Sequence, residues 1–154
     1  MTWRLLISAL AGLSLLAAAG AGSAADEEKP YVVKDGKVDA HTYNGWRRYT
    51  ESCLRCHGPD GAGSSYAPDL TESLKSMSED QFKEVVVNGR KNVNTASENV
   101  MPSFGTNPNV SCYMDDIFIY VRARANEAIG RGRPAKHEEK SDAAAKAEAS
   151  CMGQ

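Results

Sequence analysis

Several features that would point to other kinds of protein are scarce or missing in this sequence. Its 18 basic residues are outnumbered by 20 acidic ones, so the net charge of −2 does not indicate a nucleic-acid-binding surface. No segment repeats, and no stretch has the alternation of a strand over a convincing length. Long apolar runs are confined to residues 5–19. These absences favour a small, mainly helical protein with no membrane span after residue 25.

The apolar run at the N-terminus predicts an export signal. Arg4 precedes the run, and Ser23-Ala24-Ala25 supplies the small residues that signal peptidase requires. An uncleaved membrane anchor is the alternative, but the run is shorter than the roughly 20 apolar residues that span a bilayer. We therefore expect residues 1–25 to be a cleaved signal peptide.

Composition divides the exported chain into three parts. Residues 26–39 are charged and predict an N-terminal arm. Residues 130–154 are rich in Ala, Lys and Glu without an apolar stripe, which predicts a mobile tail or a solvated helix. Residues 40–129 remain for one domain of about 90 residues, near the lower limit for a well-buried core. Such a domain gains stability from a large apolar group at its centre.

Three helices are expected in this domain. Apolar periodicity predicts the first over residues 40–52, a Ser-Gln capping box predicts the second over 78–88, and acidic residues followed by arginines predict the third over 111–129. The connections at 58–70 and 92–109 are rich in Gly, Pro and Asn and predict long loops.

The stretch Cys53-Leu54-Arg55-Cys56-His57 carries the most chemical information. It could be half of a zinc site, a redox-active dithiol or an attachment site for haem. A structural zinc site needs four ligands, usually as two pairs, and Cys112 and Cys151 lie too far apart in sequence to form the second pair. A thioredoxin-like dithiol should follow a strand and open a helix, whereas here a predicted helix precedes the motif.

The haem interpretation accounts for every residue of the motif. Cys53 and Cys56 would add to the porphyrin vinyl groups, and His57 would be the proximal iron ligand. Export supports this interpretation because c-type haem is attached outside the cytoplasm. A covalent haem c also supplies the apolar centre that a small domain lacks.

The sixth ligand decides between two functions. An open position binds gases or peroxide, whereas a Met thioether raises the potential and makes an electron carrier. We favour Met101, because it lies on the long aperiodic loop and Pro102 keeps the chain extended there. His41 and His137 are alternatives that would give a lower potential. The other methionines considered are Met77, Met114 and Met152.

Together these motifs resemble those of class I cytochromes c. Gly45, Tyr49 and the Cys-x-x-Cys-His motif have the spacing of that family. The run "APDL" resembles the loop whose proline, here Pro68, accepts the imidazole N–H through its carbonyl, and "MPSFG" resembles the distal ligand loop around Met101. The resemblance covers about residues 39–129. It implies an all-α cytochrome c domain of three main helices and long loops around one covalent haem c.

The same resemblance has consequences for packing. It implies that Tyr120 packs on the first helix beside Gly45, and that Gly61 and Gly63 let the backbone approach the porphyrin. Arg48 departs from the apolar residue usual in the family at that position.

Longer runs, together with cysteines at 112 and 151, are similar to the four-cysteine c-type cytochromes associated with methanol metabolism. The resemblance implies a monomeric periplasmic electron carrier rather than an enzyme. Its donor would be a pyrroloquinoline-quinone (PQQ) alcohol dehydrogenase, and its acceptor another cytochrome c or an oxidase. Two rival interpretations remain: a haem sensor or peroxidase-like protein with an exchangeable sixth ligand, and a permanent subunit of a dehydrogenase complex.

Cys112 and Cys151 support a separate hypothesis. An even number of cysteines in an exported chain favours a disulfide that ties the tail to the start of the last helix. Two independent thiols are the alternative, because sequence alone does not determine pairing.

Overall fold

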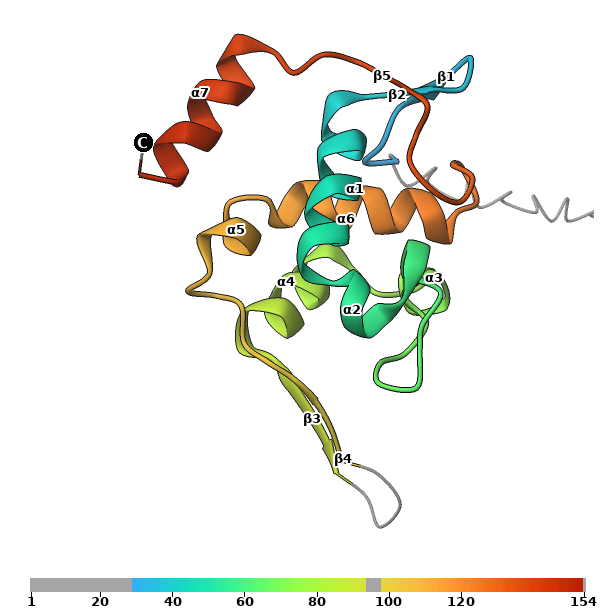
Figure 1. Cartoon of the computed structure of the whole chain (residues 1–154), viewed down its shortest axis with the longest axis vertical. Coiled ribbons are helices and arrows are strands. Elements are labelled where there is room, and N and C mark those ends of the chain that lie inside the picture. Colours follow the sequence, from blue (N-terminus) through green and yellow to red (C-terminus); the bar gives the residue numbers. More distant parts are fainter. Residues whose placement is uncertain (1–28, 94–97, 154) are drawn as a thin grey trace, which may run out of the picture.

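The computed structural model describes residues 29–93 and 98–153. The expected signal peptide lies outside these residues, as do the first residues of the expected arm. The described chain is mainly helical, as expected (Figure 1). Its elements are β1 Val33–Lys34, β2 Lys37–Val38, α1 Ala40–Ser52, α2 Leu54–His57, η1 Pro59–Gly61, α3 Leu70–Ser73, α4 Glu79–Asn88, β3 Arg90–Val93, β4 Glu98–Met101, α5 Pro108–Ser111, α6 Met114–Ala125, β5 Lys136–His137 and α7 Asp142–Cys151.

The crossing of α1 and α6 forms the centre of the molecule (Figure 1). Gly45 lies at this crossing, where a Cβ atom would be 1.8 Å from the carbonyl oxygen of Asp116 and 2.8 Å from the Cβ of Tyr120. Tyr49 and Tyr120 are fully buried, with ring centroids 5.4 Å apart. The expected packing of Tyr120 beside Gly45 is therefore confirmed, and only glycine permits this separation of the helices.

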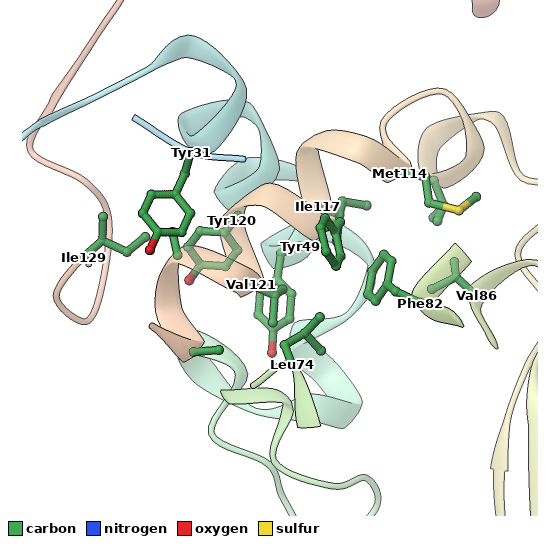
Figure 2. Packing of buried hydrophobic residues seen from close by; sticks show 14 of the residues in the cluster. Tyr31, Tyr49, Leu74, Phe82, Val86, Met114, Ile117, Tyr120, Val121 and Ile129 are labelled. Carbon is green, nitrogen blue, oxygen red and sulfur yellow. The ribbon is translucent and has the colours of Figure 1, made fainter. Parts of the chain in front are cut away.

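A second part of the core lies between α6 and α4. Figure 2 shows Phe82 and Val86 of α4 packed near Met114 and Ile117 of α6. The capping box predicted for α4 is present, and the helix ends as expected at Gly89, whose φ is 73°. Every helix in the described part of the chain is too short or too polar to cross a membrane.

Arg48 has aromatic and acidic neighbours at the position where the resemblance implies an apolar residue. Its guanidinium lies 3.6 Å from the ring centroid of Tyr113, and its Nη1 donates to Glu51 at 3.1 Å. A cation–π contact thus replaces apolar packing at this position of α1.

The last helix differs from its predicted bounds of 111–129. Ser111 ends α5 instead of opening the long helix, and α6 ends at Ala125 rather than beside Gly130. Glu127 adopts a left-handed conformation with φ 55°, and the N–H of Ala128 bonds to the carbonyl of Ala123. This is the Schellman pattern, and a glutamate occupies the position that glycine usually takes.

The structure contains strands where none were predicted. Within the segment expected to be a charged arm, β1 and β2 form a hairpin around Asp35 and Gly36, both of which have positive φ. Such Asp-Gly pairs favour type I′ turns. Strand β5 of the tail adds to β2 in parallel.

The expected loop over 92–109 also contains regular structure. Strands β3 and β4 pair antiparallel, with Arg90 opposite Met101 at the base of the hairpin. The hairpin projects away from the helices (Figure 1). Its polar residues do not alternate with apolar ones, which is why the sequence predicted a loop.

The C-terminal segment is anchored at its end by a disulfide between Cys112 and Cys151. This confirms the predicted pairing. Helix α7 buries none of its side chains, as expected of a solvated helix. Glu148 nevertheless accepts a hydrogen bond from the Nδ2 of Asn44 at 3.2 Å, which holds α7 near α1.

Candidate functional site

Both cysteines of the motif lie on one helical turn. Helix α1 ends at Ser52, and the carbonyl of Cys53 then accepts hydrogen bonds from the backbone N–H groups of Cys56, at 3.1 Å, and His57, at 2.9 Å. Side chains three apart on a turn lie on the same face, so the two thiols are neighbours. Cys56 is exposed and Cys53 is half-buried. Burial and the neighbouring Cys56 raise the pKa of the Cys53 thiol to about 12.

His57 is buried, and one of its ring nitrogens is already committed. Its Nδ1 lies 3.1 Å from the carbonyl oxygen of Pro68. Because a carbonyl can only accept, Nδ1 is the donor in this contact, and in the neutral imidazole Nε2 then has the free lone pair. Hydrogen bonds of this kind orient metal-ligating histidines and fix their tautomer. The structure therefore brings together His57 and Pro68, two of the residues expected in the site.

The loop between these residues depends on glycine. Gly58 has φ 73°, and a Cβ there would lie 2.3 Å from the carbonyl oxygen of Gly63. A Cβ on Gly63 would lie 2.8 Å from the backbone nitrogen of Asp69. The hydroxyl of Tyr49 donates to the Gly58 carbonyl at 2.6 Å. Gly63 thus tightens the loop itself, Gly61 has only ordinary contacts, and the approach of these glycines to a porphyrin remains a prediction.

Asp69 holds the segment that presents the Pro68 carbonyl, a role that the sequence reasoning did not assign. Its carboxylate caps α3, accepting from the hydroxyl of Thr71 at 2.6 Å and from the backbone N–H of Thr71 at 2.7 Å. The hydroxyl hydrogen bond, aided by the backbone N–H groups of the cap, lowers the pKa of Asp69. Asp is a preferred residue at a helix N-cap, so Asp69 is a recognisable capping signal in the sequence.

Met101 lies at the end of β4, opposite Arg90, where the hairpin joins the helices. Its side chain is half-buried and packs against the hydrophobic core. Gly89 lies directly against the backbone of Met101, since a Cβ on Gly89 would be 2.5 Å from the Met101 carbonyl oxygen. The role of Met101 as an iron ligand remains a prediction.

The other methionines lie in different surroundings. Met114 is buried in the core and Met77 is half-buried. Met77 also lines an open cavity of about 680 Å³ beside α4, together with Val85 and Arg90. None of the expected site residues lines this cavity. Because Met77 and Met101 are both half-buried and packed on the core, Met77 is the control for the assignment of Met101 as the iron ligand.

The remaining alternatives from the sequence have other partners. His41 bonds through Nδ1 to the carboxylate of Asp116 at 2.7 Å, in the first turn of α1, about 17 Å along the helix from its C-terminal end. His137 stacks on Tyr43, with ring centroids 3.6 Å apart. Cys112 is in a disulfide, so a second pair of thiolates for zinc is missing.

Comparison with known proteins identifies the family. A model described as cytochrome c oxidase, cbb3-type, subunit III matches residues 40–121. The chain is 42% identical over 96 residues to cytochrome c-555 of Methylococcus capsulatus, which covers 62% of this chain and 72% of that protein. The chain belongs to the cytochrome c family. Its described fold and the Cys-x-x-Cys-His turn are consistent with this membership.

Two further relatives of this cytochrome extend the comparison. It is 50% identical over 121 residues to cytochrome c-553I of Paracoccus denitrificans, covering 79% of this chain and 54% of that protein. The cytochrome thus spans about half the length of that relative. Among solved structures it is similar to the c-type cytochrome XoxG from Methylobacterium extorquens AM1, with a TM-score of 0.69 and 41% identity over 82% of this chain and 84% of that one.

Membership of this family establishes the cofactor class. This cytochrome carries covalent haem c. The residues present fit such a group: two neighbouring thiols, a buried imidazole with Nε2 free, and a loop that tolerates no side chain at Gly58.

Proposed function

We propose that this protein is an exported, periplasmic monohaem electron carrier whose haem is tethered by Cys53 and Cys56 and ligated by His57 and Met101. The observation that carries the proposal is the 3.1 Å contact between Nδ1 of His57 and the carbonyl of Pro68, which leaves Nε2 as the free ligand atom. When bound, the haem iron would supply reversible one-electron chemistry. No residue of the chain is required to act on a substrate.

Each residue proposed for the haem site has a distinct part in this function. Pro68 fixes the tautomer and the orientation of the imidazole, and its hydrogen bond increases the basicity of the ligand. Two thioether tethers prevent loss of the group during repeated electron transfer. A thioether from Met101 would favour the ferrous state and raise the reduction potential. A closed sixth position would also exclude the exogenous ligands that a sensor or peroxidase must bind.

The ligand assignment is tested by spectroscopy on matched variants. A pyridine haemochrome spectrum of the wild-type protein should first show haem c. Ferric wild-type protein should then have a near-infrared iron–thioether band that disappears in Met101→Ala and persists in Met77→Ala, the control. Rapid binding of carbon monoxide by ferrous wild-type protein would instead favour the sensor or peroxidase-like alternative.

We further propose a PQQ-dependent alcohol dehydrogenase as electron donor, and another cytochrome c or an oxidase as acceptor. Support comes from the runs that resemble the four-cysteine cytochromes of methanol metabolism. When ferric protein is mixed with a PQQ-dependent methanol dehydrogenase, the haem should be reduced at the turnover rate of that enzyme, and only when methanol is present. Reduction no faster than without methanol would argue against this donor.

The cellular location and assembly state need separate measurements. A periplasmic fraction should contain the holoprotein with Asp26 as its first residue, if the signal peptide is cleaved as proposed. Size-exclusion chromatography of that fraction distinguishes a free monomer from a subunit held permanently in a dehydrogenase complex.

A further inference from the structure

Asp60 has a backbone conformation that is uncommon for a residue other than glycine. It lies in η1, three residues beyond the proposed ligand His57, with φ 61° and ψ 17°. Its side chain is only 10% exposed. Left-handed non-glycine residues persist where the surrounding structure holds them, and they cluster at functional sites.

The C-terminal segment holds the carboxylate of Asp60. One carboxylate oxygen accepts the backbone N–H of Gly132 at 2.8 Å, and the other accepts Nε of Arg131 at 3.2 Å. The backbone carbonyl of Asp60 also accepts from Nε of Arg124 at 3.4 Å. The loop that follows the haem-binding motif is therefore bonded to α6 and to the chain beyond it.

The carboxylate of Asp60 lies inside the protein, whereas the side chain of Arg131 beside it is 70% exposed. Burial, followed by the nearby negative charge of Asp60, raises the pKa of the fully buried Tyr120. Charges interact more strongly in such surroundings than in water because screening is weaker. A buried negative charge near a haem iron favours the ferric state, and a cation beside that charge opposes it.

We propose that Asp60 is a positioning residue for the haem-attachment loop, and that its pairing with Arg131 tunes the reduction potential. Gly132 and Arg131 fix the carboxylate and thereby hold the turn between His57 and Gly63. Through this pair the C-terminal segment influences the electronic state of the haem. The inference rests on the proposed function, because it requires iron on His57.

The test is spectroelectrochemical titration of ferric and ferrous holoprotein. Asp60→Asn removes the charge but keeps a residue that tolerates φ near 61°. Its control, Asp35→Asn, makes the same change at an exposed position that also has positive φ. Arg131→Gln removes the cation, and its control is Arg133→Gln, since Arg133 lies two residues on and bonds to Tyr43 instead.

We expect the reduction potential to rise in Asp60→Asn and to fall in Arg131→Gln, in each case by more than in the matched control. Shifts in the same direction would show a purely structural role. Shifts no larger than those of the controls would also overturn the inference. If Asp60→Asn yields no holoprotein, Asp60→Gly relieves the backbone strain, and its potential should also lie above that of the wild type.

Failure of this inference can be told apart from failure of the proposed function. A pyridine haemochrome spectrum and the near-infrared band are recorded on every variant. If the variants contain haem c and keep the near-infrared band, but their reduction potentials do not change, only the role of Asp60 is rejected. A wild-type protein without haem c rejects the proposed function itself.

Discussion

Replacing Gly45 with alanine should destabilise the protein strongly through the crossing of α1 and α6. The new Cβ would lie 1.8 Å from the carbonyl oxygen of Asp116, whereas ordinary contacts begin at 3.4 Å. The helices would have to separate locally by about 1.5 Å, which forfeits much of the dispersion energy between them. Overpacking costs about 1–3 kcal/mol, and a collision with backbone belongs at or above the upper end. Alanine returns about 1 kcal/mol through helix propensity. We therefore expect a net loss of about 2–3 kcal/mol.

The measurement is urea unfolding of ferric holoprotein followed by far-ultraviolet circular dichroism. Gly130→Ala is the matched control, because a Cβ at Gly130 would meet nothing within 4 Å. The control should unfold with nearly the wild-type midpoint, whereas Gly45→Ala should unfold at lower urea and melt about 10 °C lower. If Gly45→Ala and Gly130→Ala lose similar free energy of unfolding, then the close helix crossing does not exist in solution.

Three further predictions concern the tail, the loop and the motif. Replacing both Cys112 and Cys151 with serine should lower the free energy of unfolding by up to about 4 kcal/mol in the chain-entropy model, given their separation of 39 residues. The measurement is urea unfolding. A loss below about 1 kcal/mol would mean that α7 does not unfold with the domain. Asp69→Ala should cost about 1 kcal/mol at pH 7. Because the pKa of Asp69 is lowered in the folded state, its stabilisation is present above the unfolded pKa and is lost as pH falls through the folded value. The free energies of unfolding of the two proteins should therefore begin to converge below about pH 4 and become equal only below the folded pKa. In haem-free protein, iodoacetamide followed by peptide mass spectrometry should modify the exposed Cys56 before the half-buried Cys53, and equal rates would contradict the described burial.

Features that depend on neighbouring residues were predictable from the sequence. The capping box of α4 follows from Ser78 and Gln81, which are three positions apart. Motifs with a known spacing also predicted contacts between residues that are far apart in the sequence. The resemblance to class I cytochromes c correctly paired His57 with Pro68, and Tyr120 with the helix that holds Gly45.

Features that depend on distant partners or on irregular turns were not predictable in the same way. Glu127 ends α6 in a conformation that sequence rules assign to glycine, so Gly130 was wrongly expected to mark the end. The hairpin around Asp35 and Gly36 was missed because charged flanking residues hid a type I′ turn signal. No sequence pattern indicated a role for Asp60, since the partners of its carboxylate lie 71 and 72 residues away.

The tail shows why composition alone underestimates a segment. Its charged, alanine-rich sequence correctly indicated that α7 has no buried face, and such a helix gains little by packing. Yet the same segment supplies both donors to the carboxylate of Asp60 at one end and the disulfide partner of Cys112 at the other. Ordering it costs conformational entropy, which these anchors must offset. Truncation after Gly130 would therefore leave a largely buried carboxylate without its donors, three residues from the proposed iron ligand.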